Sequence, residues 1–444
     1  MRRGFVDPED WSGSGTEADL AGSIMAGLTA RCANDDAFTQ EARYLEGNVR
    51  LLIGDRTWTL CFDGAGSVHV DTDENPSLES HYELAGTLED WLRVWSGAVL
   101  FAQALMGRGA TIQVNGDVVR FTAESFVMAR LVGLMADMAR PSGQANDHGA
   151  ARGSASVRRG DDHPHPVVGR YVDVRGVRTY YESYSASEGG CAFLAVHTSG
   201  RDCRQWQDLG SVLSRRGSFF ALDLPGHGKS WPVPHVGCLS SMDAIAEFVW
   251  LFWEKVGDGR PTVVLGTSVG GNLAFQLAGD HSEDVSAMVS MQGCDFIPAM
   301  SAQGSLLLDH PRINPGYNWD RSLSLVGSRA PESVRDYVEW EVRTSTSVAG
   351  KADLTAYGFD YRQRTRRIRC PSLLIRGEDD WIVTADMVRE SAARLTNAKE
   401  VKVIMPAGIG HFPHLEQPNE IACHVIDFLQ DAELLEPRYD GDRP

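Results

Sequence analysis

Residues 262–271 read T-V-V-L-G-T-S-V-G-G, and this stretch decides the fold of the larger part of the 444-residue chain. Its β-branched run predicts a strand, its glycines predict a tight turn, and a helical pattern follows over 272–279. G-x-S-x-G in this setting lifts a serine hydroxyl above a sheet, because the glycines let strand and helix pass closely. The helix N-terminus beneath the serine favours developing negative charge. Ser268 is therefore predicted to be a nucleophile, and the alternative of a serine in a surface loop leaves the preceding strand unexplained.

The chain after residue 166 alternates between strand and helix patterns. A hairpin around Gly176 is followed by short β-rich runs at 193–197, 219–222, 262–265, 288–291, 373–375 and 401–405. Helical candidates between them cover 244–256, 272–279, 387–395 and 421–429. This alternation predicts an α/β fold with a doubly wound, mostly parallel sheet, whose active site lies at the carboxyl ends of the strands.

Two later loops supply an acid and a base. Residues 376–381 read R-G-E-D-D-W after one predicted strand, and residues 407–413 read A-G-I-G-H-F-P after the last one. The chain order Ser, Asp, His is that of α/β-hydrolases rather than of chymotrypsin-like or subtilisin-like proteases. We expect His411 to be the base in preference to His414, which follows Pro413 at the start of the final helix. His227 is expected to be a structural turn residue.

Four motifs in this order resemble the α/β-hydrolase superfamily over residues ~167–432. Besides the serine and acid motifs, residues 222–230 (L-D-L-P-G-H-G-K-S) are similar to its D-x-P-G-H-G-x-S turn, and residues 410–418 read G-H-F-P-H-L-E-Q-P. The resemblance implies an α/β-hydrolase fold with a helical cap. It also implies that the acid of the G-x-x-D pattern is Asp380, with Asp379 a solvated neighbour. Some members carry the acid after the sixth strand, so Asp295 is the alternative.

The oxyanion hole is expected to use two backbone amides. One is the amide of Val269, after the nucleophile, and the other comes from the loop after the third strand. That loop reads His197-Thr198-Ser199-Gly200-Arg201, where relatives show H-G-x-G, so the second donor by position is the Ser199 amide. Because Thr198 is β-branched and resists unusual backbone angles, an altered geometry of the hole is expected here.

An insertion at about 295–368 separates the sixth and seventh predicted strands, the position at which α/β-hydrolases carry their cap. Its large apolar residues are Leu306, Leu307, Leu308, Tyr317, Trp319, Tyr337, Trp340, Tyr357 and Tyr361. They favour a bulky, hydrophobic or ring-bearing substrate. The alternative is an extra packing layer that makes no substrate contact.

The amino-terminal third has a different pattern. Period-2 alternation over 57–70 around a Gly-rich turn predicts a hairpin, and helical spacing from Leu88 to Val99 follows Thr87, a plausible N-cap, with Gly107 near the stop. The stretches 85–97, 104–109 and 112–117 resemble the sterol-carrier-protein-2 (SCP2) family, which implies a small antiparallel sheet packed against helices and an apolar tunnel for lipids. The alternative, which we favour, is that the same aromatic residues fill an ordinary core or make a dimer contact.

The domain organisation follows from composition. Residues 1–16 are expected to be a mobile tail, 17–140 an SCP2-like α+β domain, 141–166 a solvated linker rich in Gly, Ser and Pro, and 167–435 the hydrolase domain.

Charge and cysteine usage restrict the partners. The formal net charge is −18, which argues against nucleic acid or an anionic membrane as the main partner. No apolar run approaches the roughly 18 residues of a membrane span, and no secretory signal is visible. The eight scattered cysteines predict reduced thiols in a cytoplasm rather than a metal site. Arg far outnumbers Lys, which is typical of a GC-rich bacterial genome.

The sequence therefore predicts a cofactor-free serine hydrolase that cleaves an ester or lactone through an acyl-enzyme and forms a homo-oligomer. The amino-terminal domain is expected either to deliver apolar substrate to the site or to assemble the oligomer. One alternative is a carbon–carbon bond hydrolase of ring-cleavage products, and another is a cofactor-free perhydrolase. Epoxide hydrolases and dehalogenases are disfavoured, because their nucleophile is Asp where Ser268 stands. Outside catalysis, the alternative is a lipid-binding carrier with an inactive hydrolase domain.

Overall fold

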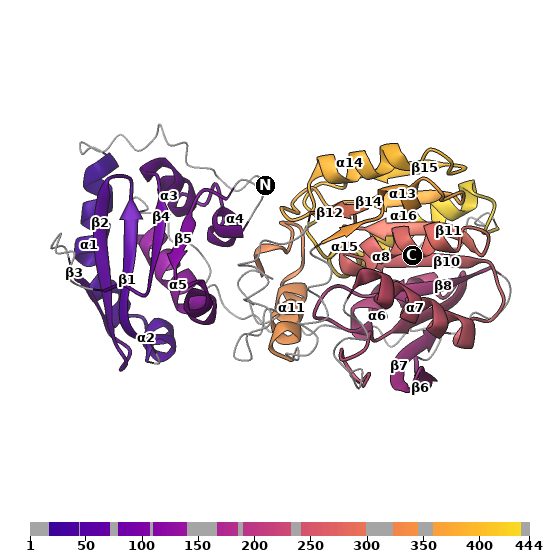
Figure 1. Cartoon of the computed structure of the whole chain (residues 1–444), viewed down its shortest axis with the longest axis horizontal. Coiled ribbons are helices and arrows are strands. Elements are labelled where there is room, and N and C mark those ends of the chain that lie inside the picture. The colour runs from indigo at the N-terminus through magenta and orange to yellow at the C-terminus, as the bar shows by residue number, and fades with distance from the viewer. Residues whose placement is uncertain are drawn as a thin grey trace. The chain divides into compact units, whose positions relative to one another are not determined.

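The computed structural model describes residues 17–43, 45–71, 79–106, 110–139, 167–184, 190–231, 241–298, 323–344 and 358–436. The chain forms two compact units, residues 1–156 and 157–444, which are described separately (Figure 1). Their division falls inside the segment predicted to be the linker. That segment, the predicted tail 1–16 and Gly107 lie outside the described residues.

The amino-terminal unit contains one five-stranded sheet, in the order β3-β2-β1-β4-β5. Its strands are β1 (Glu46–Ile53), β2 (Arg56–Asp63), β3 (Val68–Asp71), β4 (Tyr82–Gly86) and β5 (Gln113–Gly116). Its helices are α1 (Glu17–Ala33), α2 (Asp36–Ala42), α3 (Leu88–Trp95), α4 (Phe101–Met106) and α5 (Val118–Ala139). The predicted hairpin is confirmed as β2 and β3, but β1 and β4 pair in parallel, so the sheet is mixed rather than antiparallel.

Local chemistry explains where the third helix begins and ends. Thr87 accepts a hydrogen bond from the Asp90 amide, and the Asp90 carboxylate accepts one from the Thr87 amide, which satisfies two orphan donors. Trp91 and Trp95 lie four residues apart on the buried face. The prediction of one helix through Val99 is wrong, because α3 ends at Trp95 and Gly97 turns the chain with a φ of 78°.

The carboxy-terminal unit contains an eight-stranded sheet in the order β15-β14-β11-β10-β8-β9-β7-β6. The strands are β6 (Val168–Val174), β7 (Val177–Tyr184), β8 (Cys191–Val196), β9 (Gly217–Leu222), β10 (Thr262–Thr267), β11 (Val285–Met291), β14 (Ser372–Ile375) and β15 (Val401–Ile404). From β9 to β15 all neighbours pair in parallel, whereas β7 pairs antiparallel with both β9 and β6. The predicted mostly parallel sheet is confirmed.

Helices cover both faces of this sheet, as its alternating side chains require. Val263 and Leu265 of β10 face a cluster shared with α6 (Gln207–Leu213) and α16 (Pro418–Asp431). Val264 between them faces the opposite cluster, shared with α7 (Met242–Val256), α8 (Val269–Asp280) and α14 (Ala385–Arg394). The short helices η2 (Cys203–Trp206), α13 (Arg362–Thr365) and α15 (Pro413–Glu416) complete the unit. No helix within the described ranges combines the length and apolar character needed to cross a bilayer.

The insertion between β11 and β14 leaves and rejoins the body through a short ladder. β12 (Phe296–Ile297) pairs antiparallel with β13 (Phe359–Asp360), and helix α11 (Glu332–Thr344) lies between them in the chain (Figure 1). The predicted bounds of the insertion, 295–368, stay a prediction. Residues 299–322 and 345–357 lie outside the described residues, and with them Leu306, Leu307, Leu308, Tyr317, Trp319 and Tyr357.

Candidate active site

Ser268 occupies the turn between β10 and α8. Its backbone has a φ of 53° and a ψ of −114°, a conformation that non-glycine residues rarely adopt and that is held at functional sites by the surrounding structure. Its amide donates to the Met291 carbonyl of β11 at 2.9 Å. A Cβ at Gly266 would collide with the Gly270 carbonyl, and one at Gly270 with the Val196 carbonyl. The two glycines of the motif are therefore required by close backbone packing, and the side chain of Ser268 is half-buried.

His411 and Asp380 form a buried pair. His411 Nδ1 lies 2.8 Å from Asp380 Oδ2, and the two residues are 3% and 2% exposed. Because a carboxylate only accepts, Nδ1 carries the proton and Nε2 is left as the basic nitrogen. The other carboxylate oxygen accepts the Ile382 amide at 2.8 Å, and the Arg376 guanidinium donates to the Asp380 carbonyl at 2.6 Å. The acid is thus fixed in orientation before any substrate binds.

The three loops that carry Ser268, Asp380 and His411 follow β10, β14 and β15. These strands are parallel members of one sheet, so their carboxyl ends meet at the same edge. Within the described residues no hydrogen bond joins the Ser268 hydroxyl to the His411 ring. Such bonds are often long without a substrate and shorten in the reacting complex.

Asp295, the alternative acid, is engaged elsewhere. Its Oδ1 accepts from Arg394 at 2.7 Å and from the Ser391 hydroxyl at 2.9 Å, both on α14. The residue is fully buried. Of the two candidate acids, the structure places only Asp380 against His411.

The loop after β8 presents the Ser199 amide. The Thr198 carbonyl lies 2.7 Å from His197 Nδ1 and accepts the Arg201 amide at 3.2 Å. His197 Nε2 accepts the Leu224 amide at 3.0 Å, so its Nδ1 is the donor. A trans peptide is planar with its N–H opposite its C=O, so fixing the Thr198 carbonyl also fixes the direction of the Ser199 N–H.

Within the part of the chain that the structure describes, neither of the two expected oxyanion donors makes a hydrogen bond to another protein group. No hydrogen bond is found there to the amide of Ser199 or of Val269, and Val269 opens helix α8, where backbone donors have no intrahelical partner. Thr198 has no positive φ, as expected for a β-branched residue, and the altered geometry of the hole stays a prediction. The Thr198 hydroxyl, by contrast, is buried without a partner.

A carboxylate that the sequence analysis did not single out holds the His411 loop. Glu416, 1% exposed, accepts the amides of Gly410 at 2.8 Å and Phe412 at 3.0 Å, on either side of the histidine, and that of Gly327 at 2.9 Å. Burial raises its pKa, and the three amide donors oppose that rise. The only indication of Glu416 in the sequence was its place in the G-H-F-P-H-L-E-Q-P motif at residues 410–418.

The segment that leads into α11 is bonded to both the acid and the base loops. The Leu325 carbonyl accepts the His411 amide at 2.8 Å, and the Arg329 amide donates to the Gly408 carbonyl at 2.9 Å. The exposed Asp379 accepts the Ser328 amide at 2.8 Å. The insertion is therefore tied to two of the three loops through backbone groups.

The other histidines near the site have structural positions. His414 is fully buried with its ring 4.8 Å from that of Trp206, and burial lowers its pKa to about 3. His227 is buried beside the His197 ring, with Nδ1 3.1 Å from the Pro225 carbonyl. Trp206 itself is fully buried and packs in the core.

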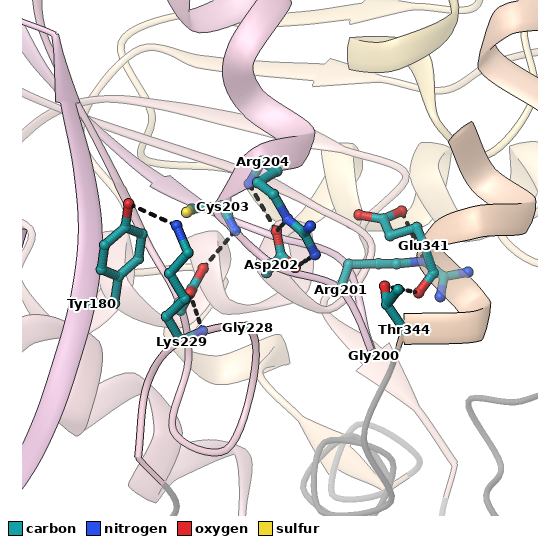
Figure 2. A pocket seen from close by; sticks show the side chains of 11 residues that line it. Tyr180, Gly200, Arg201, Asp202, Cys203, Arg204, Gly228, Lys229, Glu341 and Thr344 are labelled. Atoms are coloured by element: carbon teal, nitrogen blue, oxygen red, sulfur yellow. Dashed lines mark hydrogen bonds and ion pairs between the residues drawn. The ribbon is translucent and has the colours of Figure 1, made fainter. Parts of the chain in front are cut away.

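A polar cavity of about 230 Å³ lies between the β8 loop and α11 (Figure 2). Its lining includes Gly200, Arg201, Asp202, Arg204, Asp223, Lys229 and Glu341, but not Ser268. Of the aromatic residues expected in the cap, Tyr361 belongs to the core beneath the sheet, and Trp340 is 44% exposed under the Arg204 guanidinium. This cavity is not the apolar substrate pocket predicted from the insertion.

One group of side chains in the described residues has metal-ligand spacing: Asp202, Cys203 and Asp223. Both carboxylates already accept hydrogen bonds, Asp202 from Arg204 and Asp223 from the amides of Cys203 and Lys229. The group needs no ion to satisfy it, and we assign none. Seven of the eight cysteines are described, and none of these seven forms a disulfide.

The alpha/beta hydrolase family model matches residues 193–422, more than half of the chain, so the chain belongs to this family. A Drosophila melanogaster protein named "Probable serine hydrolase" is 26% identical over 285 residues, 54% of this chain and 81% of that protein. A 2-hydroxy-6-oxononadienedioate/2-hydroxy-6-oxononatrienedioate hydrolase of Burkholderia vietnamiensis is 25% identical over 296 residues, 60% of this chain and 98% of that protein. The enol-lactonase of Burkholderia xenovorans shares the fold with a TM-score of 0.51 at 18% identity, over 59% of this chain and 100% of that one.

Proposed function

We propose that the protein is a serine hydrolase that cleaves a carboxylic ester or lactone of a bulky apolar substrate through an acyl-enzyme. The observation that carries the proposal is the buried His411–Asp380 pair, 2.8 Å apart, at the sheet edge where the strained turn presents Ser268. Membership of the alpha/beta hydrolase family supports the reaction class.

In the first half of the reaction, His411 Nε2 takes the proton of Ser268 while the serine oxygen attacks the substrate carbonyl. Asp380 holds the imidazole in the required tautomer and stabilises its cation. The amides of Val269 and Ser199 receive the oxyanion, each such donor contributing on the order of 10²–10³ in rate. His411 then protonates the leaving group. In the second half it activates a water molecule that hydrolyses the acyl-enzyme.

Ester and lactone substrates are tested against a matched pair of variants. Ser268→Ala is expected to abolish hydrolysis over a panel of aryl esters and macrocyclic lactones, whereas Ser282→Ala, at a half-buried serine beyond α8, retains it. Full hydrolysis by Ser268→Ala would remove the proposal.

A second candidate is carbon–carbon bond hydrolysis of a ring-cleavage product by the same residues. The observation that favours it is the likeness to the Burkholderia vietnamiensis hydrolase, which spans nearly all of that protein. Turnover of ring-cleavage diketones with no turnover of esters or lactones would select this reaction. A lipid carrier with an inactive hydrolase unit is disfavoured by the intact Ser268, Asp380 and His411, and failure of every substrate in the panel would favour it.

For the amino-terminal unit we propose an SCP2-like domain that delivers apolar substrate or assembles a homo-oligomer. Its core is a hydrophobic cluster of its own, which includes Trp58, Trp91 and Trp95. Deleting residues 1–140 and measuring the mass in solution and KM separates the two roles: loss of assembly at constant KM means scaffolding. We propose a cytoplasmic location, which the reduced state of the seven described cysteines supports.

A further inference from the structure

A buried ion pair joins the insertion to the loop that carries the Ser199 amide. Glu341 on α11 lies 3.2 Å from the Arg201 guanidinium, and the two side chains are 1% and 5% exposed. Figure 2 shows the Arg201 side chain reaching from its loop towards Glu341, at the end of the cavity opposite Tyr180 and Lys229. The insertion thus supplies Arg201 with a buried partner of opposite charge.

A second link runs through an amide side chain. Gln205 Nε2 donates to Glu341 Oε2 at 3.1 Å, and Gln205 Oε1 accepts the Thr198 amide at 3.2 Å. Since Gln205 is fully buried, its side chain has no alternative partners in solvent. The position of the Thr198 backbone therefore depends on Glu341 through one intervening residue.

The two links act on the same turn. Arg201 donates its own amide to the Thr198 carbonyl, and Gln205 holds the Thr198 amide, so both sides of Thr198 are tied to residues that contact Glu341. The Thr198 carbonyl and the Ser199 N–H belong to one planar peptide. A displacement of Glu341 would therefore change the direction of the Ser199 N–H, the second expected oxyanion donor.

Electrostatics favours a positioning role over a stabilising one. A buried ion pair is weak evidence for stability, because desolvation of the two charges offsets their attraction. Burial raises the pKa of Glu341 to about 7, while Arg201 acts in the opposite direction. Asp202 adds to the rise, and Gln205 and Arg204 oppose it. An apolar contact between α11 and this loop would avoid the desolvation cost of the ion pair, but it would not fix the orientation of the Thr198–Ser199 peptide.

We propose that Glu341 is a positioning residue that orients the Ser199 amide from the cap, through Arg201 and Gln205. Because the segment 325–329 is also bonded to the loops of Asp380 and His411, the insertion holds these two loops together with the loop that carries the Ser199 amide. Correct seating of the cap is then a condition for a complete oxyanion hole. This inference rests on the proposed hydrolase function.

The test compares Glu341→Gln and Gln205→Leu with Asp336→Asn, which removes an exposed acid from the same helix. Fluorophosphonate labelling first counts the sites at which Ser268 reacts, so that kcat is expressed per labelled site. For p-nitrophenyl esters we expect kcat per labelled site to fall about 10- to 100-fold in both variants, within the range of one oxyanion donor. We expect KM to change less than about three-fold, because ground-state binding does not use this amide.

A transition-state analogue separates positioning from general loosening of the fold. The affinity for a trifluoromethyl ketone, whose hemiketal oxyanion occupies the same amides, is expected to fall by the same factor as kcat, and Asp336→Asn to behave like the unchanged protein. Gln205→Leu keeps the Arg201–Glu341 pair, so it remains informative if Glu341→Gln does not fold.

Unchanged kcat per labelled site in Gln205→Leu, or a loss explained wholly by fewer labelled sites, would overturn the inference. Absence of Ser268 labelling in the unchanged protein would instead remove the proposed function, and the inference with it.

Discussion

The two units of the chain differ in what they bury. In the amino-terminal unit the described residues include no fully buried acid, base or amide side chain, and its core is aliphatic and aromatic. In the carboxy-terminal unit Asp380, His411, Glu416 and Glu341 are all nearly inaccessible. Burying such groups costs free energy unless each is hydrogen-bonded or paired, so they persist where chemistry requires them. The contrast favours the carboxy-terminal unit as the site of the proposed reaction.

The largest expected effect separates the two buried carboxylates near the sheet edge. Asp380→Asn should lower kcat by about 10⁴-fold, because the amide no longer selects the His411 tautomer. Asp295→Asn, the matched variant, should change kcat by less than about ten-fold while lowering stability, because Arg394 loses its buried carboxylate partner and keeps only the exposed Glu390. Steady-state kinetics on both variants decide the point, and the reverse ranking would make Asp295 the acid.

The next effect concerns the apolar core of the amino-terminal unit. Leu60→Ala creates a cavity at a fully buried position and should lower the free energy of unfolding of that unit by about 2–5 kcal/mol. Denaturant unfolding measures the loss, and kcat on a small ester should stay unchanged. A parallel fall in kcat would show that this core supports the reaction, and would contradict the separate roles of the two units.

A smaller effect is expected at the carboxylate beneath the base. Glu416→Gln replaces an oxygen that accepts backbone amides with a donor, so the His411 loop shifts, and we expect kcat to fall about 10- to 100-fold. The free energy of unfolding should fall by about 1–3 kcal/mol. Glu420→Gln, at a partly exposed glutamate that pairs with Arg329, is the control. Equal kinetics in the two variants would contradict a positioning role for Glu416.

The last expected effect is a pH dependence of stability. Burial lowers the pKa of His414 to about 3, with His411 acting in the same direction. The unfolded chain therefore binds this proton first, and stability is lost as the pH falls from about 6.5 towards 3. His414→Phe should flatten that slope in urea unfolding, whereas His69→Gln, on the surface of the other unit, should not. Part of the slope should remain, because burial also lowers the pKa of His197 to about 3. Identical slopes in the unchanged protein and His414→Phe would contradict the account.

The predictable part of the molecule is the part that a local pattern specifies. The parallel sheet and the strained turn at Ser268 follow from runs of β-branched residues and from glycines that close packing requires. The proximity of Asp380 and His411 follows from strand order, since both loops leave the same edge. In the amino-terminal unit, periodicity predicted the hairpin and the Thr87 cap but not the end of α3.

The unpredicted part depends on pairs far apart in the chain. Gln205 and Glu341 are 136 residues apart, and no local spacing indicates that they meet. Glu416 was visible within a motif, but which amides its carboxylate accepts depends on the segment around Gly327. The parallel pairing of β1 with β4 likewise depends on how the chain crosses between the two strands, which side-chain alternation does not indicate.

The proposed mechanism requires that Ser268 forms a covalent acyl intermediate. Mass spectrometry of the protein quenched within one turnover of an activated ester tests it most directly. We predict a mass increase equal to the acyl group, which peptide digestion maps to Ser268 and which is absent from Ser268→Ala. Product formation without any adduct at Ser268, or an adduct on another residue, would contradict it.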